Sequence, residues 1–254
     1  MAASSASRHR HLGLPDAVRV CLFDLDGVLP QTAKVHAAAW KQMFDEFLGQ
    51  GAARTGQPLV PFDAVADYDE YVDGKPRYDG VRSFLAARHI QLPEGTADDP
   101  PGAATVHGLG NRKNELVLRL IHEQGVEAYG GSVRYVHAAR DAGMRTAVVS
   151  SSANCRDVLR AAGIEELFDA RIDAIVAERE HLRGKPAPDT FLAGARALGV
   201  GPDASSVFED ALAGVEAGRA GRFAYVVGVD RVGQADALRA HGADVVVRDL
   251  DELL

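Results

Sequence analysis

The segment "AVRVCLFDLDGVL" (residues 17–29) places two carboxylates one residue apart at the end of an apolar run. Residues 17–23 have the composition of a buried strand, and a buried strand has no use for acids. Asp24 and Asp26 are two residues apart, so they would lie on the same face if the strand simply continued. A turn at Gly27 would end the strand there and leave both carboxylates at its end. Both carboxylates could then act on one ligand at the end of the strand.

Four later segments resemble this first strand. They are "MRTAVVS" (144–150), "SSVFED" (205–210), "FAYVVGV" (223–229) and "ADVVV" (243–247). Segments with helical spacing separate them, at 131–142, 153–162, 189–198 and 213–220. This alternation predicts an α/β fold, a Rossmann-like parallel sheet with helices on both faces. A glycine follows each helical segment and predicts a left-handed helix end, at Gly143, Gly163, Gly199 and Gly221.

The region between residues 32 and 127 has a different pattern. Three segments there have helical spacing and no convincing strand accompanies them: "AKVHAAAWKQMFDEFL" (33–48), "VRSFLAARHI" (81–90) and "NRKNELVLRLIHEQG" (111–125). Residues 94–105 are expected to form a loop because they are rich in Gly, Pro and Asp. We therefore expect a core domain of residues 1–31 and 128–254, with a small helical cap domain, 32–127, inserted after the first strand.

Composition limits the classes of partner. The net charge of -8 over 254 residues argues against a nucleic-acid surface and against a polybasic membrane patch. Two cysteines make no disulfide framework, and Cys21 is expected to be a small apolar core residue. No apolar run reaches the ~18–20 residues of a membrane span. Residues 1–17 lack the apolar centre of a secretory signal and are expected to be a frayed tail. A monomeric cytoplasmic protein is expected.

Polar side chains gather where the predicted strands end. In open parallel sheets, ligands bind beyond the carboxyl ends of the strands. Hard oxygen ligands suit Mg²⁺, which usually takes one or two carboxylates together with substrate phosphate. The residues at these ends and in the loop "GKPAPDTF" (184–191) are Asp24, Asp26, Ser150, Ser151, Ser152, Asn154, Lys185, Glu209 and Asp210.

This set supports phosphoryl transfer. Asp24 could attack phosphorus and form an acyl phosphate, while Asp26 moves protons to and from the sugar oxygen. Lys185 would offset phosphoryl charge, and Ser150 with backbone N–H groups at the next helix start would hold the phosphate. Each residue alone has an ordinary alternative: a turn acid, a surface lysine, a helix cap. Their order at successive strand ends favours a site.

Together, "FDLDGVL", "VVSSS", "GKPAPDTF" and "VFEDALAGVEAG" resemble the haloacid dehalogenase superfamily of phosphotransferases. The helical insertion resembles that of the β-phosphoglucomutase subgroup. The resemblance implies that Asp24 is the nucleophile and Asp26 the general acid and base. It implies Mg²⁺ bound by Asp24, the Asp26 main-chain carbonyl, Glu209 and Asp210, and a phosphoryl group held by Ser150 and Lys185.

The cap carries its own points of resemblance. "QTAKVHAAAWK" (31–41) is similar to the hinge and first cap helix, "VDGKPR" (72–77) to the specificity loop, and "NRKNELV" (111–117) to a helix with a phosphate-contacting lysine. The resemblance implies that Arg77 grips the phosphate that does not react. The implied substrate-binding residues are Thr32, His36, Trp40, Gly74, Arg77, Lys113, Ser151, Ser152 and Asn154, with Asn114 nearby. The ordinary alternatives are a surface histidine for His36 and a core aromatic for Trp40.

The sequence also departs from the subgroup. Gln31 stands where the family usually has an acid, Pro30 precedes it in the hinge, and Ala153 stands where mutases carry a lysine. Extra residues occur at 50–61 and 94–108. These changes leave the phosphoryl chemistry intact and affect the hinge and the sugar site.

The resemblance implies a β-phosphoglucomutase-like isomerase of β-glucose 1-phosphate and glucose 6-phosphate. Such an enzyme uses a phospho-aspartyl enzyme and a bisphosphate intermediate, needs Mg²⁺, and is primed by glucose 1,6-bisphosphate. The alternative is a phosphatase of the same superfamily, acting on a sugar phosphate or a related small phosphorylated metabolite. A non-catalytic phosphosugar sensor would be favoured if the acids were missing, and both Asp24 and Asp26 are present.

Overall fold

The computed structural model describes residues 12–56 and 58–254. Contacts between Cα atoms group the chain into two compact units. The α/β unit comprises the chain up to Gln31 together with Val126–Leu254, and the helical unit is Thr32–Gly125. Each unit is described by itself.

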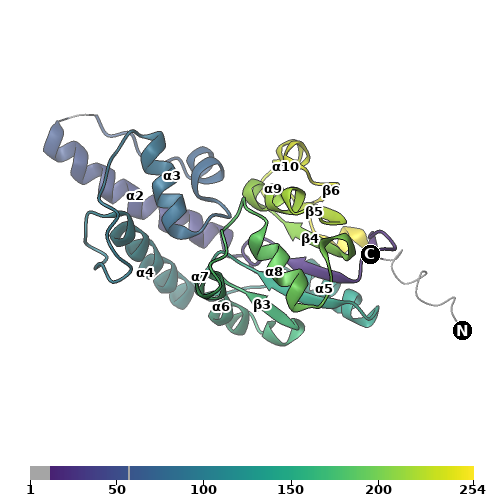
Figure 1. The fold of residues 1–254 in the computed structure, drawn as a ribbon. Helices are drawn as coiled ribbons and strands as arrows, with labels where there is room; N and C mark the ends of the chain where they lie inside the picture. The colour runs from purple at the N-terminus through teal and green to yellow at the C-terminus, as the bar shows by residue number, and fades with distance from the viewer. Residues whose placement is uncertain (1–11, 57) are drawn as a thin grey trace, which may run out of the picture. The chain divides into compact units, whose positions relative to one another are not determined.

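The α/β unit is built on a parallel sheet with strand order β3-β2-β1-β4-β5-β6 (Figure 1). The strands are β1 Val20–Phe23, β2 Arg145–Val149, β3 Ala170–Ile172, β4 Ser205–Glu209, β5 Tyr225–Val229 and β6 Val245–Val247. The predicted Rossmann-like fold is therefore confirmed, and β3 is an additional strand. Since β1 lies between β2 and β4, the ends of these three strands are neighbours. The chain reverses its direction of travel across the sheet at this point, where α/β proteins bind ligands.

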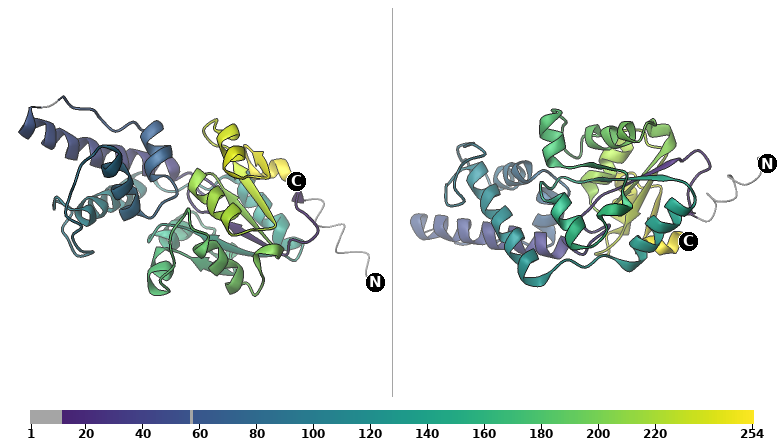
Figure 2. Two further views of the ribbon diagram at one scale, coloured as in Figure 1. Left: turned by 45° about the horizontal axis from the view of Figure 1, so that its top comes forward. Right: turned by 90° about the horizontal axis from the view of Figure 1, so that it is seen from below.

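Helices cover both faces of this sheet, as two further views show (Figure 2). They are α5 Gly130–Asp141, α6 Cys155–Ala161, α7 Ala174–Arg179, α8 Asp189–Ala197, α9 Leu212–Ala220 and α10 Ala235–His241, with short 3-10 turns η3 Glu165–Leu167, η4 Pro202–Ala204 and η5 Leu250–Leu253. Val20 and Leu22 of β1 pack in the cluster that includes Phe191 of α8. On the opposite face, the ring of Phe23 packs edge-on against Tyr135 of α5 at 6.3 Å. Alternation along β1 thus supplies two cores.

The glycines after the helices follow the prediction at three positions. Gly143, Gly163 and Gly199 have φ of +84°, +69° and +69°, in the left-handed region. The prediction is wrong for Gly221, whose φ is -76°. A Cβ there would lie 2.5 Å from the ring of Phe223, so close approach of a side chain is what requires glycine.

The helical unit contains α2 Ala33–Thr55, a π-helical turn η2 Tyr68–Val72, α3 Arg77–Ala87 and α4 Val106–Gln124. Helix α2 runs past the predicted segment and ends at Gly56, with φ +69°. The core of the helical unit is aromatic. The centroid of the Phe44 ring lies 5.3 Å from that of Trp40, 5.2 Å from that of Phe62 and 4.1 Å from that of Phe84. No strand occurs in the described residues of this unit, and 94–105 lie outside its helices, as predicted.

The expected N-terminal tail is only partly open to comparison, because residues 1–11 lie outside the described part of the chain. For the remainder the prediction is wrong. Leu12 and Leu14 are buried, and the Tyr135 hydroxyl donates a 2.8 Å hydrogen bond to the Leu12 carbonyl. Tyr135 has an apolar ring and a polar hydroxyl, and the hydrogen bond of this hydroxyl anchors the segment that begins at Leu12 to α5.

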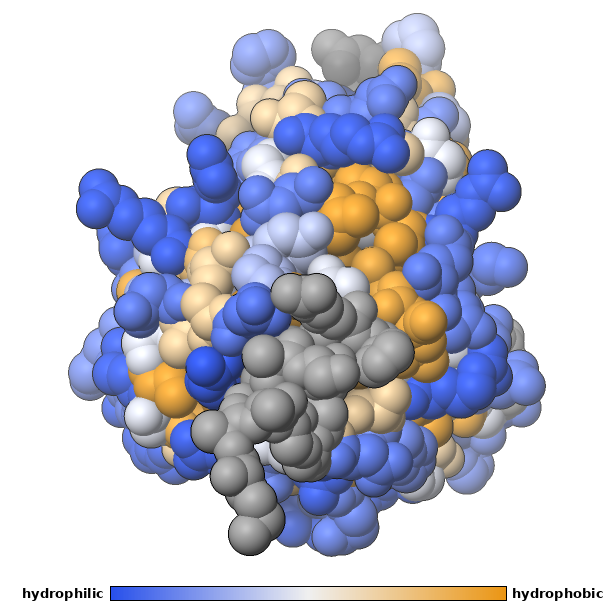
Figure 3. Space-filling model, turned by 90° about the vertical axis from the view of Figure 1, so that its right-hand side faces the viewer, coloured by the Kyte–Doolittle hydropathy of each residue, from blue (hydrophilic) through white to orange (hydrophobic). Residues whose placement is uncertain are grey.

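The polarity of the surface and the burial of the two cysteines agree with the composition. The face shown in Figure 3 is mostly hydrophilic with a limited apolar area. Within residues 12–56 and 58–254, none of the helices is long and apolar enough to cross a membrane. Both Cys21 and Cys155 are buried free thiols.

Candidate active site

The turn after β1 orients the two aspartates. The Asp24 N–H donates to the Phe208 carbonyl at 2.9 Å, which extends the ladder with β4 by one residue. The chain then turns: the Leu29 N–H donates to the Leu25 carbonyl at 2.9 Å, and Gly27 has φ +83°. The predicted turn at Gly27 is present. Asp24 is buried beyond the strand end and Asp26 is half-buried.

Three carboxylates converge at this edge of the sheet. Oxygens of Asp24, Glu209 and Asp210 lie within 4.8 Å of one another, and all three residues are buried. Two glycines leave the space for them. A Cβ on Gly27 would overlap the carboxylate of Asp210, and a Cβ on Gly214 would overlap that of Glu209. The local sequence therefore accommodates an unusual concentration of acid.

Lys185 is the ammonium group of the cluster. Its Nζ forms an ion pair with Asp24, lies 2.5 Å from Glu209 Oε1, and donates to the Val149 carbonyl at 3.3 Å. Burial alone would lower the pKa of Lys185, but the carboxylates of Asp24 and Glu209 outweigh it and raise that pKa. Lys185 is thus a permanent positive charge placed against the predicted nucleophile.

The cluster brings a third carboxylate close to the two that pair with Lys185. Lys185 pairs with Asp24 and Glu209, and an oxygen of Asp210 lies within 4.8 Å of theirs. Buried charges cost several kcal/mol unless they are compensated. Burial and the neighbouring carboxylates of Glu209 and Asp26 raise the pKa of Asp24 despite Lys185. Hard oxygen donors around a net negative charge fit a divalent cation such as Mg²⁺. Asp24, Glu209 and Asp210 are the side chains that would hold it, and the predicted contribution of the Asp26 carbonyl stays a prediction.

Serine hydroxyl groups stabilise the turn after β2. The Ser150 N–H donates to the Ile172 carbonyl at 2.9 Å. Ser150 Oγ accepts from the Ser152 N–H at 3.0 Å, and Ser152 Oγ accepts from the Asn154 N–H at 3.1 Å. These turns take two of the backbone N–H groups predicted to bind phosphate. The hydroxyl proton of Ser150 is not used in these two bonds, so it is the donor this loop can offer to a ligand.

In the helical unit, α2 and α4 bring three predicted residues together. Lys113 of α4 is buried, with Nζ 2.9 Å from Nδ1 of His36 on α2. The same Nζ lies 4.9 Å from the centre of the Trp40 ring. The two nitrogens are within hydrogen-bond distance, and an ammonium can only donate in such a contact. Trp40 is buried and stacks on Phe44, so it also fits the alternative of a core aromatic.

The predicted specificity loop ends in the first turn of α3. Gly74 has φ +68° and Arg77 begins the helix. The guanidinium of Arg77 lies over the Tyr78 ring, 4.8 Å from its centre. The Lys75 ammonium donates to the Glu70 carbonyl at 3.0 Å and to the Ser83 hydroxyl at 3.1 Å, so it is engaged in local hydrogen bonds. Thr32 is buried immediately before α2, and its carbonyl accepts from the His36 N–H at 2.9 Å.

Sequence reasoning missed two residues that support the core site. Arg231 Nε donates to the Gly27 carbonyl at 2.9 Å, and its guanidinium stacks on Tyr129 at 3.6 Å. Gln234 Nε2 donates to the Asp210 carbonyl at 3.0 Å. Both follow β5, whose end is marked in the sequence by the polar run "DRVGQ" (230–234). The polar residues that follow β5 were the sequence signal that could have identified Arg231 and Gln234.

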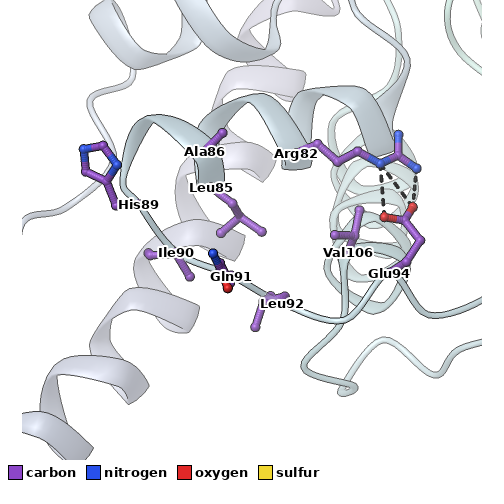
Figure 4. Close-up of a pocket in the computed structure, with 9 residues that line it drawn as sticks. All are labelled: Arg82, Leu85, Ala86, His89, Ile90, Gln91, Leu92, Glu94 and Val106. Carbon is purple, nitrogen blue, oxygen red and sulfur yellow. Dashed lines mark hydrogen bonds and ion pairs between the residues drawn. The ribbon is translucent and has the colours of Figure 1, made fainter.

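A pocket of about 540 Å³ lies elsewhere, on the helical unit (Figure 4). Polar and apolar side chains share its lining: Leu85 and Leu92 are among the apolar ones, and the Arg82–Glu94 ion pair lies at one side. None of the predicted site residues lines it. Its lining therefore shares no residue with the carboxylate cluster.

Comparisons with known proteins identify the family of the chain. A family model described as haloacid dehalogenase-like hydrolase matches residues 18–222. A β-phosphoglucomutase of Mycobacterium bovis is 58% identical over 250 residues, 97% of this chain and 95% of that protein. One from Bacillus subtilis is 32% identical, covering 93% and 92%. A crystal structure of β-phosphoglucomutase from Clostridium difficile shares the fold, with TM-score 0.73, 24% identity and 93% of each chain covered. The chain belongs to the haloacid dehalogenase-like hydrolase family.

Proposed function

We propose that this protein is a β-phosphoglucomutase that interconverts β-glucose 1-phosphate and glucose 6-phosphate. The observation that carries the proposal is the near full-length identity with the M. bovis β-phosphoglucomutase. The buried cluster of Asp24, Lys185, Glu209 and Asp210 supports it, since it supplies a nucleophile, a fixed cation and a set of oxygen ligands.

Asp24 would be the group that receives the phosphoryl. Its carboxylate oxygen attacks phosphorus of the bisphosphate, the P–O bond to the sugar breaks, and an aspartyl phosphate forms. Asp26 gives a proton to the departing sugar oxygen. In the second half, a hydroxyl of the sugar monophosphate loses its proton to Asp26 and attacks the aspartyl phosphate. The P–O bond to Asp24 breaks, and its electron pair returns to the Asp24 carboxylate. The bisphosphate is thus regenerated, with the sugar in the opposite orientation.

Charge on the transferring group would be offset from two sides. Lys185 is fixed within the cluster by Asp24 and Glu209, so no reorganisation is needed when charge develops. Mg²⁺, held by Asp24, Glu209 and Asp210 with the Asp26 carbonyl, would add positive charge at the phosphoryl oxygens. Ser150 would donate its hydroxyl proton to one of those oxygens.

A mutase also has to hold the phosphate that is not reacting. Arg77 is suited to this because its planar guanidinium can bind a phosphate through two N–H groups. Lys113 and His36 would contact the sugar phosphate from the same helical unit. Glucose 1,6-bisphosphate would prime the enzyme by phosphorylating Asp24.

The second candidate is a phosphatase on a small phosphorylated metabolite, which the hydrolase description of the family favours. It would form the same phospho-Asp24 and pass the phosphoryl group to water. The two candidates differ only in the acceptor.

Phosphorus NMR of β-glucose 1-phosphate with the enzyme and Mg²⁺, with and without glucose 1,6-bisphosphate, tests the proposal. We expect the glucose 6-phosphate signal to grow, and to grow faster when the bisphosphate is added. Growth of inorganic phosphate alone, at a rate indifferent to the bisphosphate, would replace the mutase by the phosphatase.

A further inference from the structure

Tyr78 follows Arg77 in α3 and contacts its guanidinium in two ways. The guanidinium lies over the Tyr78 ring at 4.8 Å, and its Nη2 donates a 3.0 Å hydrogen bond to the Tyr78 hydroxyl. A guanidinium has five N–H donors, so this bond leaves others for a ligand. The contact limits the rotation of a long side chain that would otherwise have many conformations.

The Tyr78 ring is itself held by α4. It stacks on His107, with 3.9 Å between ring centres. On another side it lies so close to Gly110 that a Cβ there would be 2.6 Å from the ring. Gly110 thus allows the ring to reach α4, and the hydroxyl at its end has a fixed position.

A directional chain of hydrogen bonds runs from Arg77 to the segment before α4. The Tyr78 hydroxyl donates its single proton to Asn111 Oδ1 at 2.8 Å, so it accepts from Arg77. The amide of Asn111 donates to the carbonyls of Ala97 at 3.0 Å and Asp99 at 2.8 Å. These bonds fix which end of the amide faces Tyr78.

Residues 94–105 are braced in turn against the start of α4. The Thr105 hydroxyl donates to Asp99 Oδ2 at 2.6 Å and accepts from the Gly108 N–H at 2.9 Å. This segment lies between α3 and α4. Its carbonyls are the groups that orient Asn111.

We propose that Tyr78 is a positioning residue for the recognition of the second phosphate, and that residues 94–105 act with it through Asn111. Tyr78 holds the Arg77 guanidinium in one orientation, so less freedom is lost when phosphate binds. The inference rests on the proposed function, because it needs Arg77 to bind the phosphate that does not react.

Tyr78→Phe tests this role, since it removes the hydroxyl and keeps the ring. We expect the Michaelis constants for β-glucose 1-phosphate and glucose 1,6-bisphosphate to rise about three- to tenfold, the range of a single hydrogen bond. The Michaelis constant for p-nitrophenyl phosphate, which has no second phosphate, should rise much less. Tyr71→Phe is the matched control, because it removes a hydroxyl of the same unit whose hydrogen-bond partner is Glu70. Equal rises for both kinds of substrate would overturn the proposal.

A double-mutant cycle shows whether Tyr78 acts through Arg77. In an Arg77→Ala background, Tyr78→Phe should change the Michaelis constant for the bisphosphate by less than about twofold. Independent, multiplying effects would overturn the positioning role. If Arg77→Ala alone changes nothing, the proposed function of Arg77 fails. If Arg77→Ala impairs bisphosphate binding and Tyr78→Phe does not, this inference alone fails.

Asn111→Ala tests the contribution of residues 94–105. The Tyr78 hydroxyl would lose its acceptor there, so the Michaelis constant for the bisphosphate should rise in the same direction as in Tyr78→Phe. An unchanged constant in a variant whose thermal unfolding matches the parent would remove the segment from the proposal.

Discussion

At the scale of single residues, the site depends on carboxylates with different surroundings. Asp24 is buried beside Lys185 and Glu209, whereas Asp26 is half-buried on the turn that follows. A buried, cation-paired carboxylate suits the nucleophile. A more accessible carboxylate, three residues beyond the end of β1, suits proton exchange with a sugar oxygen.

Asp26→Asn should lower the turnover of sugar phosphates by about 10²–10⁴-fold, the usual contribution of a general acid or base. The loss should be smaller for esters such as p-nitrophenyl phosphate, whose leaving group needs no proton. Mg²⁺ affinity, measured by calorimetry, should change little because the predicted metal contact of Asp26 is through its main chain. A uniform loss across leaving groups would argue against the assignment.

Lys185→Met should destabilise the protein and abolish phosphoryl transfer. It leaves Asp24 and Glu209 buried without their cation, a change that typically costs about 3–5 kcal/mol. Thermal unfolding without Mg²⁺ should show the loss, and Mg²⁺ should restore more stability to the variant than to the parent. Lys34→Met, at an exposed position of α2, is the control. Equal unfolding temperatures in Lys185→Met and the control would mean that Lys185 pairs weakly.

At the scale of elements, the spacing between α9 and the end of β4 makes the cluster possible. Gly214 of α9 faces the Glu209 carboxylate, whose other oxygen accepts from the Ala211 N–H at 2.8 Å. The place of the Glu209 carboxylate therefore depends on a glycine, which leaves the space that this carboxylate occupies.

Gly214→Ala should weaken Mg²⁺ binding and turnover together, because the new methyl group occupies the place of the Glu209 carboxylate. Gly49→Ala is the matched control: it is the same change in a helix, with no neighbour within 4 Å of the added carbon. The control should gain up to about 1 kcal/mol from helix propensity. Full activity in a folded Gly214→Ala protein would show that Glu209 can move without consequence.

The strands that position the site could be predicted because the sequence of each strand alone indicates it. β1, β2 and β4 are almost wholly buried, and each has apolar residues directly before the polar residues at its end. β3 could not be predicted, since Ala170–Ile172 is three residues long with an arginine at its centre. The support from Arg231, Gln234 and Tyr78 depends on contacts between distant segments, which no spacing along the chain reveals.

At the scale of the whole molecule, the buried thiols report on folding. Burial raises the pKa of Cys21 to about 12 and the pKa of Cys155 well above its usual range. Neither thiol should react with a disulfide reagent at pH 8 in the native state, since little thiolate forms and access is blocked. Both should react in denaturant. Rapid labelling of the native protein would contradict the packing described around β1 and α6.

The central claim is that phospho-Asp24 passes its phosphoryl group to a sugar hydroxyl in preference to water. Single-turnover transfer measures this directly: enzyme phosphorylated with labelled glucose 1,6-bisphosphate is mixed with β-glucose 1-phosphate, and the label is followed. Asp24→Asn, which removes the nucleophile, is the control and should take up no label. The account predicts that most of the label moves from the wild-type enzyme to sugar phosphate. Label released mainly as inorganic phosphate, at a rate unaffected by the sugar phosphate, would contradict it.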